Sequence, residues 1–225
     1  MKNNSDLQKD VQDAIKWEPL LHAAEIGVTA KDGIVTLTGT VDNYSKKKEA
    51  ENAAKSVMGA RVVVEKIEVK FNDAMGDKDD NDIALDILRA LKANHKTATD
   101  NILVAVEDGW LTLEGNVLWN YQRLAAENAV KDLQGVKGVS NNISIRSNAQ
   151  ESVQKLDIER ALRRNWAIND DDITVQVAGS KVILVGSVKS WYQKDEAEKI
   201  AWNAPGVWTV DNSLVVEHDY ELVNE

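Results

Sequence analysis

Hydrophobic residues follow two kinds of periodic pattern along the chain, one typical of helices and one typical of strands. Val11, Ala14 and Ile15 have the spacing of one helix face, and residues 26–30 then alternate between apolar and polar as in a half-buried strand. An Asp-Gly turn, a second alternating strand, an alanine-rich helical stretch and a third strand follow. The pattern predicts the order helix, strand, strand, helix, strand.

This pattern occurs three times. Residues 32–41 are DGIVTLTGTV, residues 108–117 are DGWLTLEGNV, and residues 179–188 are GSKVILVGSV. The positions that recur in all three copies are Gly39, Gly115 and Gly186; Gly59, Gly135 and Gly206; and the pairs Ala50–Glu51, Ala126–Glu127 and Ala197–Glu198. Such internal agreement indicates a duplicated unit, whose length is that of a small domain rather than of a solenoid repeat.

The repeated unit predicts an α+β fold of three tandem αββαβ domains. In each, two helices would cover one face of a three-stranded mixed sheet, because each element has a single apolar face. The helix between the last two strands would make a right-handed crossover if those strands are parallel. We expect domains at 1–72, 78–147 and 152–219, with polar linkers at 72–80 and 147–153.

Two structural roles are predicted for the recurring glycines. The first glycine of each copy is expected where the second strand gives way to a helix. It would either adopt a conformation costly for other residues or let the helix approach closely. The second glycine is predicted to stop that helix. The helix itself should begin near Asn43, Asn120 or Ser190, and Ser190 with Gln193 has capping-box spacing.

This order of elements, with the recurring glycines and the Ala-Glu helix, resembles the BON domain, a family named for bacterial osmotically inducible periplasmic and nodulation proteins. The resemblance covers almost the whole chain. It implies an αββαβ fold and a non-enzymatic binding role. It also implies an association with osmotic stress, the cell envelope and phospholipid surfaces, with some members serving as transport-associated modules on channels or secretins.

Composition narrows the function classes. The 225 residues carry a net charge of −10, which argues against non-specific nucleic-acid binding, and the lack of cysteine removes disulfides and thiolate chemistry. The polar start has no signal-peptide core, and no segment is apolar enough to span a membrane. The sequence as given predicts a cytoplasmic protein, or a periplasmic one if a signal peptide has been removed.

No catalytic site or cofactor is predicted. His22, His95 and His218 fall at non-equivalent positions of the repeats, and none has a partner at metal-ligand or triad spacing. We interpret them as surface residues, and we predict no metal site.

Two acidic stretches leave cation binding open as a weaker alternative. Residues 76–82 (GDKDDND) resemble a calcium loop but lack its central glycine, so we interpret them as a linker in which Asp80 or Asp82 caps a helix. Residues 169–172 (NDDD) are interpreted as a turn before a strand.

Aromatic residues follow the first recurring glycine of each copy: Trp119 and Tyr121, Trp191 and Tyr192, and Tyr44. They either pack over the edge of the core, or form an exposed rim for a partner or for lipid headgroups.

The first helix of the third copy ends in cationic and aromatic residues. They are Arg160, Arg163, Arg164, Trp166 and Ile168. Cations beside an interfacial aromatic suit a membrane surface, although an ordinary solvated helix end is the alternative. The first copy has Lys16 and Trp17 at a related place.

The sequence therefore favours a non-enzymatic bacterial stress or envelope-associated binding protein that contacts phospholipid surfaces. The alternatives are a protein-interaction or chaperone-like module and a cytoplasmic protein that responds to potassium or calcium. Oligomeric state is not predicted.

Overall fold

The computed structural model describes residues 3–21, 26–71, 78–96, 101–146, 153–168 and 172–217. Its elements repeat the same order three times, as predicted. The first repeat contains α1 (Asn4–Trp17), β1 (Ile26–Lys31), β2 (Ile34–Val41), α2 (Tyr44–Ser56) and β3 (Val62–Val69). The second contains α3 (Asp80–Ala93), β4 (Ile102–Glu107), β5 (Trp110–Val117), α4 (Asn120–Val130) and β6 (Gly138–Ile145). The third contains α5 (Lys155–Arg164), β7 (Ile173–Ala178), β8 (Lys181–Val188), α6 (Trp191–Trp202) and β9 (Thr209–Val216).

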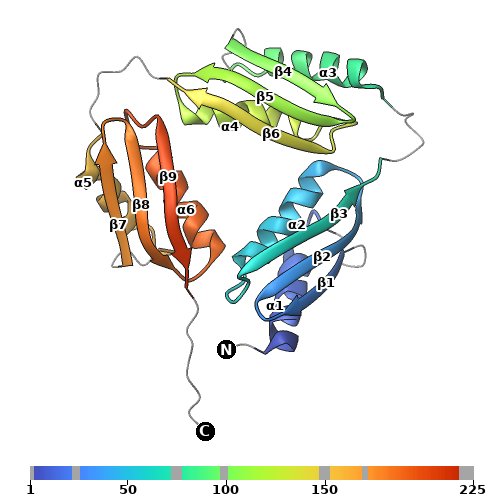
Figure 1. Cartoon of the computed structure of the whole chain (residues 1–225). Helices are drawn as coiled ribbons and strands as arrows, with labels where there is room; N and C mark the ends of the chain where they lie inside the picture. The colour runs from blue at the N-terminus through green and yellow to red at the C-terminus, as the bar shows by residue number, and fades with distance from the viewer. Residues whose placement is uncertain are drawn as a thin grey trace. The chain divides into compact units, whose positions relative to one another are not determined.

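Each repeat has its own three-stranded sheet, in the order β1-β2-β3, β4-β5-β6 or β7-β8-β9. The first two strands of each sheet are antiparallel, whereas β5–β6 and β8–β9 are parallel. The two helices of a repeat cover one face of its sheet (Figure 1). The prediction of three tandem α+β units with mixed sheets is confirmed.

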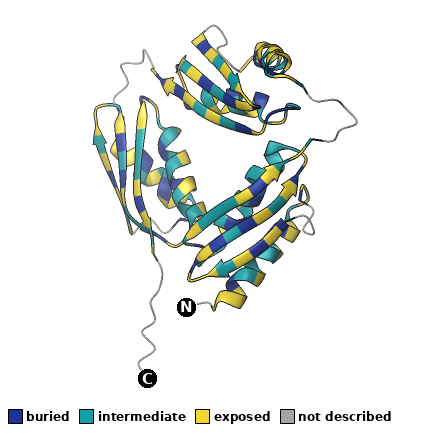
Figure 2. Cartoon of the chain, turned by 45° about the vertical axis from the view of Figure 1, so that its right-hand side comes forward, coloured by how far each residue is buried: buried dark blue, intermediate teal, exposed yellow. Residues whose placement is uncertain are grey.

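Alternation along the strands places the core of each repeat between its sheet and its helices. The inward side chains of the central strand, such as Leu37 and Leu184, are fully buried. They meet the apolar stripes of both helices, and in the third repeat these stripes include Ile158, Leu162 and Ala201. Small alanines on the second helix let its backbone approach the sheet closely. Figure 2 shows buried residues recurring at every second position along much of the central strands β2, β5 and β8.

The first glycine of each repeat lies inside the second strand and not at its end, so its predicted place was wrong. Gly39, Gly115 and Gly186 are each two residues before the strand ends, with φ of 138°, 125° and 130°. A Cβ on Gly186 would lie 1.9 Å from the carbonyl oxygen of Asp172. Glycine is therefore required by a close backbone approach between the two strands of the hairpin.

The second glycine lies beyond the helix, which ends earlier than predicted. Gly59, Gly135 and Gly206 have φ of 100°, 95° and 79° and follow helices that end at Ser56, Val130 and Trp202. Each occupies the third position of a tight turn, as in the bond from the Val136 N–H to the Leu133 carbonyl (3.2 Å). The helix-stop prediction was wrong by three to five residues.

In the second repeat, the Asp80 side chain at the start of α3 binds the hairpin turn between β4 and β5. Asp108 and Gly109 both have positive φ (51° and 78°), the geometry of a tight type I′ turn. The Asp80 carboxylate accepts hydrogen bonds from both of their N–H groups, at 2.8 and 2.9 Å. The predicted cap was therefore misplaced: Asp79 caps α3 by accepting from the Asp82 N–H at 2.8 Å.

In the second and third repeats, the glutamate of the Ala-Glu pair has a structural partner on the third strand. Asn141 Nδ2 donates to Glu127 Oε2 (3.1 Å) and to the Arg123 carbonyl (3.0 Å). The third repeat makes the same two bonds from Asn212, at 3.0 Å to Glu198 and 2.9 Å to the Lys194 carbonyl. This amide bridge joins the second helix to the edge strand in these two repeats.

The first repeat has Glu65 at the position of the bridging asparagine, and its Glu51 pairs with Lys55 at 2.7 Å. A carboxylate cannot donate as an amide does, so Glu65→Asn should stabilise this repeat by about 1 kcal/mol through a new hydrogen bond. Thermal unfolding of the whole chain, resolved by hydrogen exchange in peptides from β3, measures the effect. The matched change Asn212→Glu should destabilise the third repeat. A lower melting temperature for Glu65→Asn would contradict this account.

Candidate functional site

The cationic residues at the end of α5 lie on the face opposite its buried stripe. Arg160, Arg163 and Arg164 are all exposed, and Trp166, two residues beyond the helix, is 95% exposed. We call these four residues the α5 tip. A tryptophan side chain this open to water leaves a large apolar area without a cover, which is unusual for so large a ring.

A short turn after α5 explains why Trp166 points outward. The Asn165 N–H donates to the Leu162 carbonyl at 3.0 Å, and its side-chain Oδ1 accepts from the Ala167 N–H at 3.0 Å. Ile168 then returns to the core, where it is 7% exposed. The prediction that Ile168 belongs to a binding surface was therefore wrong, because this residue anchors the turn from inside.

The start of α6 lies against this turn. Gln193 Nε2 donates to the Ala167 carbonyl at 2.8 Å, so the aromatic residues that precede Gln193 share one end of the repeat with the α5 tip. Tyr192 is 46% exposed, whereas Trp191 is half-buried with Lys194 Nζ 5.3 Å from its ring centroid. Ser190 accepts from the Gln193 N–H at 3.2 Å, as its capping spacing predicts.

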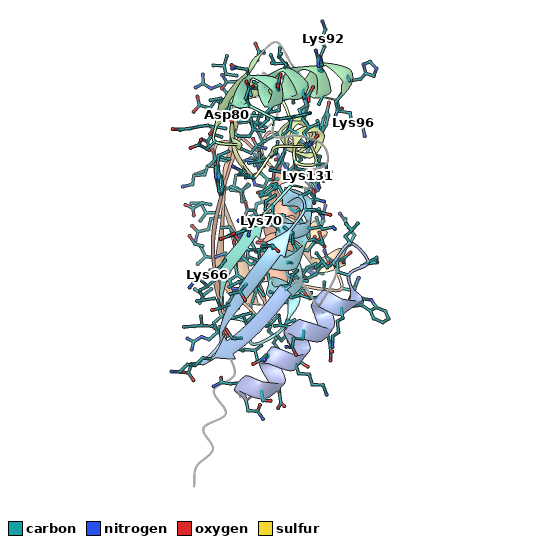
Figure 3. The ribbon with its side chains drawn as sticks, turned by 90° about the vertical axis from the view of Figure 1, so that its right-hand side faces the viewer. Lys66, Lys70, Asp80, Lys92, Lys96 and Lys131 are labelled. Atoms are coloured by element: carbon teal, nitrogen blue, oxygen red, sulfur yellow. The ribbon has the colours of Figure 1, made fainter. Side chains whose placement is uncertain are left out.

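The second repeat keeps the aromatic rim but not the tryptophan at the tip. Trp119 is 40% exposed and Tyr121 is 56% exposed, at the start of α4. The end of α3 instead carries Lys92, His95 and Lys96, and Figure 3 shows both lysines at the end of the helix remote from Asp80. Only the third repeat therefore combines several cations with an exposed tryptophan at this position.

The first repeat also has an exposed tryptophan at the end of its first helix. Trp17, the last residue of α1, is 89% exposed. Leu21 is buried and donates its N–H to the Glu18 carbonyl at 3.0 Å, so it anchors this turn as Ile168 does in the third repeat. Sequence reasoning noted Trp17 but not its near-complete exposure. The signal that could have identified the anchor is the apolar residue at the equivalent position of both repeats.

The carboxylates with shifted pKa values belong to surface ion pairs. A hydrogen bond from Lys78 lowers the pKa of Asp86, which Arg89 also contacts at 3.1 Å. A hydrogen bond from Lys181, at 2.9 Å, together with one from Ser213, lowers the pKa of Asp211. These shifts stabilise the charged forms and do not prepare either carboxylate for proton transfer.

Acid should weaken the third repeat through Asp211. Because the folded pKa lies below the ordinary value, the ion pair contributes fully above about pH 4 and is lost as the pH falls through the folded pKa. The melting temperature of the third repeat should drop less steeply between about pH 5 and pH 2 in Asp211→Asn than in the parent. Equal slopes would show that this pair does not contribute.

Metal chemistry finds no support in the part of the chain that the structure describes: no group of three or more His, Asp or Glu residues there could hold a metal ion. His95 is exposed. His22 and His218 lie outside the described residues, as do parts of the acidic stretches at 76–82 and 169–172. Among the described helices, none combines the length and the apolar character needed to cross a membrane.

Comparison with known proteins gives the family. The BON domain model matches residues 3–70, 79–147 and 150–218. The chain is 28% identical over 144 residues to Osmotically-inducible protein Y of Escherichia coli (strain K12), a match covering 63% of this chain and 72% of that protein. Solved structures that resemble it include CdsD, a structural protein of the type III secretion system of Chlamydia trachomatis (16% identity, TM-score 0.24, 93% of this chain and 91% of that one), and the C-terminal domain of CdsD (17% identity, TM-score 0.23, 95% and 98%). Because the three family matches span nearly the whole sequence, the chain belongs to the BON domain family.

Proposed function

We propose that this chain is a non-enzymatic, stress-related and envelope-associated binding protein that contacts anionic phospholipid surfaces through the α5 tip. The observation that carries the proposal is the 95% exposure of Trp166 beside three exposed arginines. The stress and envelope association is supported by family membership and by the similarity to Osmotically-inducible protein Y.

The α5 tip offers both apolar and electrostatic attraction to a bilayer interface. A tryptophan ring has an apolar body and a polar N–H group, and it prefers the headgroup region, where both are accommodated. Each arginine near an anionic surface adds about 1 kcal/mol, so the three arginines together add about 3 kcal/mol. The net charge of −10 opposes approach, which makes local contact through the α5 tip weak and dependent on salt.

Co-sedimentation with vesicles tests this proposal. The full chain should bind phosphatidylglycerol vesicles at low salt, more weakly at physiological salt, and phosphatidylcholine vesicles weakly or not at all. Replacing Arg163, Arg164 and Trp166 together with alanine should weaken binding at least about tenfold, since each tenfold step is about 1.4 kcal/mol.

A matched control comes from the second repeat. Replacing Lys92, His95 and Lys96 together with alanine alters the equivalent helix end, which lacks the tryptophan, and should leave vesicle binding within about twofold. Unchanged binding in the α5 tip variant would exclude that tip as the lipid site.

A protein-binding role is the second candidate. Four large apolar side chains, Leu118, Trp119, Tyr121 and Leu124, are all at least 40% exposed within one short stretch at the start of α4. This rim would bind polypeptide with little dependence on salt, because apolar contact is not screened by ions. Binding of an unfolded test protein that is lost in Trp119→Ala/Tyr121→Ala and retained in the α5 tip variant would favour this role.

A further inference from the structure

One side of α1 carries three aspartates and ends in an exposed tryptophan, and the exposed Lys9 and Lys16 lie beside them on the outward surface of the helix. Asp6, Asp10, Asp13 and Trp17 are separated by 4, 3 and 4 residues, so they share one helix face. The buried residues of α1 (Leu7, Val11 and Ile15) lie on the other side of the helix. Asp13 contacts Lys16 at 3.9 Å, an exposed pair that contributes little stability. We call these four residues the α1 face.

The α5 tip has the same shape of arrangement with the opposite charge. Its three arginines lie opposite the buried Ile158 and Leu162, and its tryptophan stands just beyond the last turn. Arg160 contacts Asp157 at 3.4 Å, and both side chains of this pair are more than half exposed. The two helices therefore present complementary surfaces, one with carboxylates and one with guanidinium groups, each beside a tryptophan that water surrounds.

We propose that the α1 face of one copy of this chain docks onto the α5 tip of a second copy. Carboxylates of α1 would meet the arginines of α5, and a guanidinium group stacked on Trp17 would gain a cation–π contact. Docking would also remove the indole rings of Trp17 and Trp166 from water, which adds a hydrophobic contribution to the ionic contacts. The complementary partner for each surface is thus present on every copy.

The geometry of this contact determines the kind of assembly. The two surfaces are different, so each copy can bind one neighbour through its α1 face and another through its α5 tip. The association is therefore head-to-tail. Such contacts extend into short chains unless the rotation closes a ring. One helix face against one helix end is a small interface, below the area of stable complexes, so the association is weak and reversible.

Sedimentation velocity of the full chain over a wide range of protein concentration tests the proposal. The mean sedimentation coefficient should rise with concentration at physiological salt and rise less at high salt. Asp10→Lys/Asp13→Lys should weaken self-association at least about tenfold, and Arg163→Glu/Arg164→Glu should do the same. All four residues lie outside the cores, and circular dichroism checks that each variant is folded.

Mixing the two variants gives the decisive result. An equimolar mixture contains one native pairing and one pairing with exchanged charges, so association should return to near the parent level. Failure of the mixture to associate, or a sedimentation coefficient independent of concentration in the parent chain, would overturn the proposal. Lys92→Glu/Lys96→Glu in the second repeat is the matched control and should not alter self-association.

The same variants separate this inference from lipid binding. Asp10→Lys/Asp13→Lys leaves the α5 tip intact, so it should lose self-association and still bind phosphatidylglycerol vesicles. Loss of vesicle binding without loss of self-association in Arg163→Glu/Arg164→Glu would overturn the docking proposal while leaving the lipid site in place. The vesicle surface and the second copy of the chain would bind the same α5 tip. Adding phosphatidylglycerol vesicles should therefore dissociate the assemblies of the parent protein.

Discussion

Replacing Gly186 with alanine should unfold the third repeat. The added Cβ would lie 1.9 Å from the Asp172 carbonyl oxygen, and this contact is with backbone, so no side-chain rotation relieves it. The residue also has φ of 130°, a conformation that side chains rarely adopt. Steric overlap and backbone strain together should cost about 3 kcal/mol or more, a large part of the stability of a small domain. Hydrogen exchange in peptides from β7 and β8 measures the loss.

Gly179 provides a matched control in the same hairpin. It has φ of 61°, but an added Cβ would meet nothing within 4 Å. Gly179→Ala should therefore cost only about 1 kcal/mol of backbone strain. Similar exchange rates in the two variants would show that the close approach to Asp172 does not explain the recurring glycine.

Truncating Ile168 to alanine should be the second largest effect. This side chain is buried in the core of the third repeat, so the change removes apolar contacts and leaves a cavity, at a cost of about 2–5 kcal/mol. The turn after α5 would also lose its anchor, and hydrogen exchange should rise first at Asn165–Ile168. Thermal unfolding and peptide-resolved exchange measure both consequences.

Trp166 lies two residues away, and truncating it should have almost no effect on stability. Because it is 95% exposed, Trp166→Ala should change the free energy of unfolding by no more than about 0.5 kcal/mol. This contrast separates the residue that holds the turn from the residue that the turn presents. A destabilisation by Trp166→Ala equal to that of Ile168→Ala would mean that the ring packs on the domain.

Periodicity predicted the regular elements well because it reports which side of an element is buried. The alternation of Val35 and Leu37, and of Val182 and Leu184, predicted which side chains of the second strand face the core, and all four are fully buried. Duplication strengthened each assignment, since three copies of one pattern had to satisfy one fold. The Asp-Gly turn indicated an antiparallel hairpin, and the parallel pairs β5–β6 and β8–β9 fit the helix that connects the last two strands.

Predictions failed where periodicity stops. Ile168 lies in a turn, where sequence spacing no longer reports burial, so its position beside three arginines suggested the surface. Gly186 signalled an unusual backbone conformation, but a single sequence cannot distinguish a strand end from a close approach within a strand. The exposure of Trp17 and Trp166 depends on which residue of the turn returns to the core, and that is a property of the folded chain.

The hold of Asp80 on the hairpin turn sets limits on how such repeats can be recombined. Residues 78–80, where the predicted linker at 72–80 overlaps the predicted second domain at 78–147, have contacts within the second repeat: Lys78 pairs with Asp86, Asp79 caps α3, and Asp80 binds the turn. A recombination event that joined two repeats a few residues after Asp80 would produce an α3 helix without its N-cap. The hairpin turn would also lack the contact from Asp80. We therefore expect a duplicated second repeat to keep its helix cap and its hairpin contact only when the duplicated segment starts at or before Lys78.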